Sequence, residues 1–81
     1  MNSVILASLL IAFSPSPDVP MQYIGTTPFQ DKLSCVHANI AYANVYHAAS
    51  PTNSYLGTCV DEEGRPYHIL KIRGLKEKTN D

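Results

Sequence analysis

The sequence predicts a small α+β fold in which one helix packs on a small antiparallel sheet. Three features indicate this fold class. A helix-start pattern occurs at residues 26–30, Pro51 marks the end of that helix, and two strand-like runs flank a short loop containing a glycine. At 81 residues the chain is one domain at most, which argues against a multidomain enzyme.

The helix is expected over residues 28–49. Thr27 is a suitable N-cap, Pro28 fits the first helical position, and Gln30 three residues after the cap completes a capping box. The helix should end before Pro51, because the residue that precedes a proline avoids the α conformation.

Two strands and a possible third are expected around this helix. The runs 54–61 and 66–73 flank Glu62-Glu63-Gly64-Arg65, where a glycine able to adopt positive φ favours a β-hairpin. Residues 21–24 alternate weakly between polar and apolar side chains and precede Gly25, so they form a candidate first strand.

Apolar residues are concentrated at the N-terminus. Ten of the first 13 residues are hydrophobic, against 44% over the whole chain, and no charged side chain precedes Asp18. The apolar run 4–13 is too short for a membrane span, which needs about 20 residues, but it fits the core of a secretory signal peptide. Pro15 and Pro17 should hinder cleavage in this region.

Three interpretations of this leader therefore stay open: a cleaved signal peptide, an uncleaved weak membrane anchor, or an arm or strand that packs into an assembly. The expected organisation is an apolar leader at 1–14, a proline-rich linker at 15–20, a domain at 21–74 and a polar tail at 75–81.

Cys35 and Cys59 are the two cysteines of the chain. An even number of cysteines in a small, exported domain favours one disulfide, because such a domain buries little core. Two free, buried cysteines are the alternative. No C-x₂-C spacing is present, so a zinc site is not expected.

The predicted helix lies in a stretch without formal charge. No Asp, Glu, Lys or Arg occurs among the 28 residues from Leu33 to Val60. Depletion of charge together with tyrosine is typical of the core of a protein–protein interface. If Cys35 bonds to Cys59, the Leu33–Ile40 stripe faces away from the hairpin and must be covered by the N-terminal strand, a protein partner, a second copy or a membrane. A helix buried in a small core is the alternative. The predicted interface residues are Phe29, Leu33, Val36, Ile40, Tyr42 and Tyr46.

Catalytic and metal-binding residues are not expected, and no cofactor is implied. His37 and His47 would lie about 15 Å apart along the helix, which is too far for one metal ion. His68 lies on a predicted strand, and a small metal protein or enzyme that uses these histidines remains an alternative. The net charge of −1 argues against nucleic-acid binding. Membrane contact is expected only through the leader.

The apolar leader, the Phe29 helix start with Cys35 six residues later, and the return strand with Cys59-Val60 are similar to short secreted orphan proteins of bacterial and bacteriophage genomes. This resemblance implies an accessory or structural role and assigns no functional residue. The function expected is non-enzymatic protein binding or a structural role in the periplasm, the extracellular space or a virion. A periplasmic inhibitor or lysis-type regulator is the alternative.

Overall fold

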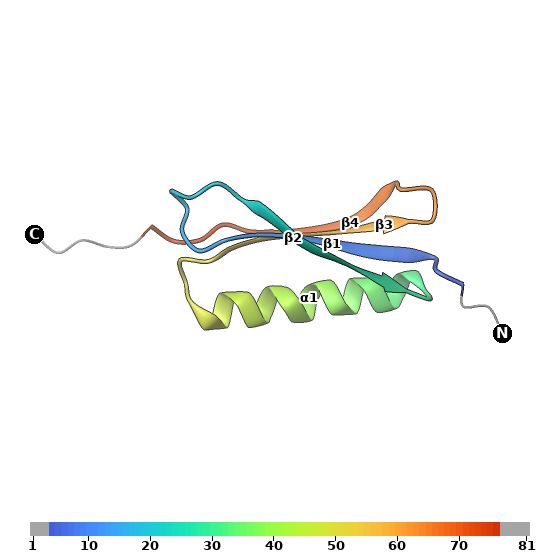
Figure 1. Ribbon diagram of the computed structural model, residues 1–81. Helices are drawn as coiled ribbons and strands as arrows, with labels where there is room; N and C mark the ends of the chain where they lie inside the picture. Colours follow the sequence, from blue (N-terminus) through green and yellow to red (C-terminus); the bar gives the residue numbers. More distant parts are fainter. Residues whose placement is uncertain (1–3, 77–81) are drawn as a thin grey trace, which may run out of the picture.

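The computed structural model describes residues 4–76 and contains one helix on a four-stranded sheet (Figure 1). This arrangement confirms the predicted α+β class. The elements, in chain order, are β1 (Ala7–Ser14), β2 (Gln22–Phe29), α1 (Lys32–Ala49), β3 (Ser54–Asp61) and β4 (Pro66–Ile72).

The N-terminal apolar segment supplies a central strand of the sheet. The strand order is β2-β1-β3-β4, and every neighbouring pair is antiparallel. Strand β1 therefore hydrogen-bonds to β2 on one side and to β3 on the other. The expected division into a leader at 1–14, a linker at 15–20 and a domain starting at residue 21 differs from this structure, because residues 15–21 connect two strands of one sheet.

The core lies between the helix and one face of the sheet. On β1, Ala7, Leu9 and Ile11 are buried, whereas Ser8 and Leu10 between them are only half-buried. This alternation follows from the two-residue period of a strand. Figure 1 shows α1 along one side of the sheet, and no described element lies against the other side.

The helix begins at Lys32, four residues later than expected, and β2 is correspondingly longer than the predicted strand at 21–24. Asp31, not Thr27, is the N-cap: its carboxylate accepts hydrogen bonds from the backbone N–H and the hydroxyl of Ser34, both at 2.8 Å. Pro28 lies in β2, where a residue without an N–H is tolerated because β2 is an edge strand.

The hairpin follows the prediction closely. Strand β3 has the expected bounds, and β4 ends one residue earlier than expected. Gly64 has a φ of 81°, so the turn uses the positive φ that the sequence predicted there. The Asp61 carboxylate accepts hydrogen bonds from the backbone N–H groups of Arg65 and Glu63, which lower its pKa.

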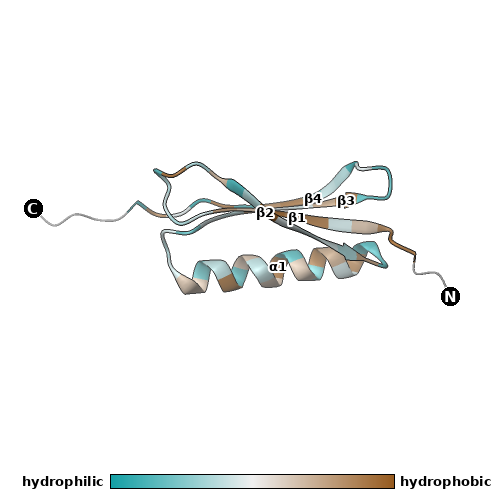
Figure 2. Cartoon of the chain, in the orientation of Figure 1, coloured by the Kyte–Doolittle hydropathy of each residue, from teal (hydrophilic) through white to brown (hydrophobic). Residues whose placement is uncertain are grey.

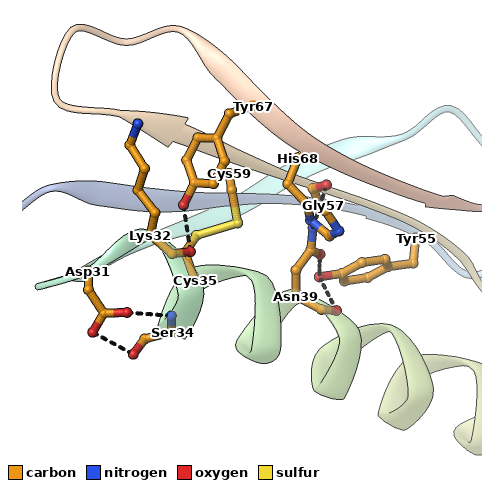
Figure 3. Close-up of a disulfide and its surroundings, with 10 residues drawn as sticks. All are labelled: Asp31, Lys32, Ser34, Cys35, Asn39, Tyr55, Gly57, Cys59, Tyr67 and His68. Carbon is orange, nitrogen blue, oxygen red and sulfur yellow. Dashed lines mark hydrogen bonds between the residues drawn. A yellow bond between two sulfur atoms is a disulfide. The ribbon is translucent and has the colours of Figure 1, made fainter.

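A disulfide joins the helix to the sheet, as predicted. It links Cys35 in α1 to Cys59 in β3, with the two Cα atoms 6.1 Å apart, and both residues are fully buried (Figure 3). The bond determines which helix face contacts the sheet: Cys35, Asn39 and Ala43, spaced four residues apart, are the buried residues of α1.

Removing this disulfide should lower the free energy of unfolding by about 3.5 kcal/mol, because the bond closes a loop of about 25 residues in the unfolded chain. The variant Cys35→Ala/Cys59→Ala should shift the urea midpoint down accordingly, and dithiothreitol should shift the unaltered protein to a similar midpoint. Dithiothreitol should have no effect on the double variant. Alkylation of both cysteines in the folded, unreduced protein would contradict the assignment.

Candidate interaction surfaces

The outward side of α1 is the first candidate surface. We define the outer helix face as the exposed residues Leu33, His37, Ile40, Ala41, Asn44, Val45 and Ala48. Leu33 and Val45 are each 63% exposed and Ile40 is 44% exposed. None of these residues carries a formal charge at neutral pH with histidine neutral. This surface thus offers three large apolar side chains to solvent.

The six predicted interface residues do not share one surface. Leu33, Ile40 and Tyr42 are exposed, and Val36 is half-buried. Phe29 lies at the end of β2, outside the helix, and packs against the core.

Tyr46 also belongs to the core side of the helix. Its ring centroid lies 5.1 Å from that of Phe13 and 5.5 Å from that of Tyr55, so the three tilted rings form a cluster between helix and sheet. The helical period places Tyr46 on the same side as Cys35, which is the signal that assigns it to the core. Val45 is exposed and was not among the predicted residues.

The uncovered side of the sheet is the second candidate surface, which the sequence did not indicate. Side chains of residues paired across neighbouring strands point to the same side of a sheet. Leu10 of β1 is paired with Thr26 and Thr58, Thr58 with Ile69, and Leu56 with Ala12 and Lys71. We define the open sheet face as Ser8, Leu10, Ala12, Tyr23, Thr26, Leu56, Thr58, Val60, Ile69 and Lys71.

This open sheet face is apolar and shallowly hollowed. A depression of about 210 Å³ is lined by Leu10, Ile11, Ala12, Tyr23, Leu56 and Thr58. Ile69 is 60% exposed beside it. In Figure 2 the hydrophobic colour follows β1 through the middle of the sheet, while the β3–β4 turn is hydrophilic.

A buried polar network holds the centre of α1 to β3 and β4 (Figure 3). The Asn39 amide Nδ2 donates to the Gly57 carbonyl at 2.9 Å and lies 3.2 Å from His68 Nδ1. The Tyr55 hydroxyl donates to Asn39 Oδ1 at 2.6 Å. Because both Asn39 and Tyr55 are almost completely buried, these bonds satisfy polar groups that water does not reach. The network therefore serves the structure.

Burial raises the pKa of Tyr55 from 10.0 to about 12. The unfolded chain loses this phenolic proton near pH 10, whereas the folded protein keeps it, so the folded state binds more protons between these values. We therefore expect the free energy of unfolding to fall as pH rises from 10 towards 12.

Urea unfolding at pH 9, 10, 11 and 11.5 measures this dependence. Tyr55→Phe should be less stable than the unaltered protein at pH 9, because a buried hydrogen bond is lost, but its stability should decline less steeply with pH. Equal slopes for both proteins would refute the assignment of this pH dependence to Tyr55.

The histidines do not come together. His37 and His47 are exposed on α1, and His68 contacts Asn39 from β4. Among residues 4–76, no group of three or more His, Cys, Asp or Glu side chains could hold a metal ion. Within the same part of the chain, no helix has the length and hydropathy that crossing a membrane requires.

Comparisons of this chain with protein-family models, with curated proteins and with solved structures gave no match. The similarity to short secreted orphan proteins of bacteria and bacteriophages therefore stays a prediction.

Proposed function

We propose that this protein is a non-enzymatic binding or structural subunit that docks a protein partner on the outer helix face. It acts outside the reducing cytoplasm, since a buried disulfide is typical of proteins from oxidising compartments. It binds the partner by burying exposed apolar side chains, with Leu33 and Ile40 as the principal anchors.

The observation that carries this proposal is the exposure of apolar residues on a helix face without charge. A helix on the surface of a soluble domain normally places charged residues on its solvent side. Here Leu33, Ile40 and Val45 are exposed, and the helix has no Asp, Glu, Lys or Arg after Lys32. Charge depletion around exposed apolar anchors is the composition expected at the centre of a protein interface.

The position of β1 favours a structural-subunit role, for example in a virion or another large assembly. Loss of residues 1–14 would remove the strand that joins β2 to β3, so a protein that works in this fold retains them. The other setting, a periplasmic inhibitor or lysis-type regulator, is compatible with the same docking surface provided that β1 is retained.

Affinity capture with the full-length chain tests the proposal. Leu33→Asp and Ile40→Asp should each abolish capture of the partner while keeping the thermal midpoint within a few degrees, because both residues are exposed. Ile69→Asp on the open sheet face is the matched control, since Ile69 has a similar exposed fraction to Leu33.

The control variant should retain capture of the same partner. If Leu33→Asp and Ile40→Asp retain the partner, or if either variant unfolds the protein, the outer helix face is not the docking surface.

A further inference from the structure

We infer that the open sheet face is the interface of an antiparallel homodimer, in which two copies of this chain stack sheet on sheet with their helices outside. This inference is independent of the outer helix face. It rests on the distribution of charge over the sheet, on twofold symmetry and on the size of the face.

Charge is concentrated at the two ends of the sheet. Within residues 4–76, Lys71 is the charged side chain on the open sheet face, at its β4 border, and Arg73 follows two residues later. Both line a hollow of about 170 Å³ at this end, together with Val19 and Met21. Asp18 lies in the adjoining β1–β2 connection, but among the described residues neither Lys71 nor Arg73 forms an ion pair.

The opposite end of the sheet is acidic. The β3–β4 turn carries Asp61, Glu62 and Glu63, and it lies at the far end of the sheet from residues 73–76 (Figure 1). Glu63 is paired with Arg65 at 3.7 Å, whereas Glu62 has no ion pair among the described residues. Lys71 is five residues from the start of β4, so about 17 Å of strand separates it from the turn.

Twofold symmetry joins these two ends. Two copies whose sheets meet through the same face are related by a twofold axis that lies between the two sheets. If this axis runs across the strands, each strand of the partner runs in the opposite direction. Strand β4 then lies over the partner's β4, and the basic end of each copy lies over the acidic turn of the other. Each dimer contains this complementary contact twice. An axis along the strands would instead place β4 over the partner's β2 and would leave each basic end far from the partner's acidic turn, so the complementary contact would be lost.

The size of the face suits a reversible dimer. Four strands of seven or eight residues form a face of about 19 Å by 25 Å, or about 480 Å² per copy. Two copies therefore bury about 950 Å², close to the roughly 1,000 Å² expected of a specific interface. The depression beside Leu10 and Leu56 gives side chains of the second copy a place to interdigitate, as in aligned sheet packing.

Sedimentation equilibrium of the full-length protein tests this inference. We expect a monomer–dimer equilibrium whose dissociation constant rises between 50 mM and 500 mM NaCl, since the end contacts are exposed ion pairs. Lys71→Glu and Glu62→Lys should each raise the dissociation constant of the dimer about tenfold, because each substitution occurs twice in a symmetric dimer. The combined variant Lys71→Glu/Glu62→Lys should restore the affinity, because the charges are exchanged between the two ends.

Two further variants separate this interface from other surfaces. Leu10→Asn should weaken dimerisation, because it places a polar amide within the open sheet face. Lys32→Glu is the charge-matched control, since Lys32 lies at the start of α1, and it should leave the affinity unchanged. Circular dichroism should show folded protein in each variant.

Three results would overturn the inference: a monomer at every concentration, a dimer that survives Leu10→Asn but is lost in Ile40→Asp, or failure of the combined charge exchange to restore affinity. Flotation with vesicles of phosphatidylserine and phosphatidylcholine is the last check. A protein that is monomeric in solution and binds these vesicles through Lys71 would assign the open sheet face to a membrane surface instead.

Discussion

Leu9→Asn should unfold this protein, whereas Leu10→Asn should leave it folded. Leu9 is 0% exposed beneath α1, in a central strand of the sheet. Asparagine there would lose the buried apolar contacts and would bury an amide without partners, at a cost of about 4 kcal/mol or more. Small domains lie near the lower end of the usual stability range of about 5 to 15 kcal/mol, so most of the fold's stability would be lost.

Leu10 is the matched control because it is the same residue type, one position later, on the open sheet face. It is half-buried, so an asparagine there keeps contact with solvent and should lower the thermal midpoint by only a few degrees. Thermal unfolding of the full-length chain, followed by circular dichroism, measures both effects. Intact mass confirms that residues 1–14 are present in the samples compared.

This pair of variants distinguishes a structural strand from a cleaved or loosely attached leader. In a signal peptide or a membrane anchor, Leu9 and Leu10 contribute equally to the hydrophobic run and neither contributes to the stability of the domain. A strand, in contrast, has a two-residue period, so neighbouring leucines have opposite environments. Equal effects of the two substitutions on the thermal midpoint would exclude β1 as a central strand.

The sequence could not separate these interpretations, and the reason is physical. Strand β1 is buried on one face and half-buried on the other, so both Leu9 and Leu10 are apolar and the alternation expected of a half-exposed strand is absent. What identifies the strand is its pairing with β2 and with β3, and β3 begins 40 residues after β1 ends. Local patterns carry no information about such a distant partner.

Elements that depend on local chemistry were predicted more accurately. The hairpin bounds follow from Gly64 and the strand-like runs beside it, and the helix ends before Pro51 as expected. The predicted start of the helix was wrong because two capping patterns compete, and the structure uses Asp31 with Ser34. Thr26 and Thr27 are β-branched and extend β2 instead.

The candidate surfaces were predicted in part. The constraint from Cys35 correctly placed Leu33 and Ile40 on the outside of the helix. The open sheet face was missed because it depends on β1 lying in the sheet. Once β1 is a central strand, Leu10 and Leu56 become neighbours on a surface that the single helix leaves uncovered.

Gly57→Ala should lower the free energy of unfolding by about 4 kcal/mol, although it adds only one methyl group. A Cβ atom at this position would overlap the Asn39 side-chain oxygen and the Tyr55 hydroxyl. The substitution must therefore displace the amide that bonds to Gly57 and Tyr55. Breaking two buried hydrogen bonds costs about 1 to 3 kcal/mol each, and crowding a packed core adds a similar amount.

Gly25→Ala is the matched control, because a Cβ atom at Gly25 would have no atom within 4 Å and its φ is not positive. This variant should change stability by about 0.5 kcal/mol or less. Urea unfolding of both variants, together with Asn39→Ala and Gly57→Ala/Asn39→Ala, completes the test. Removing the Asn39 amide gives the new methyl group room, so the double variant should be less destabilised than the sum of the single variants. Strict additivity would show that Gly57 is required for some reason other than its contact with Asn39.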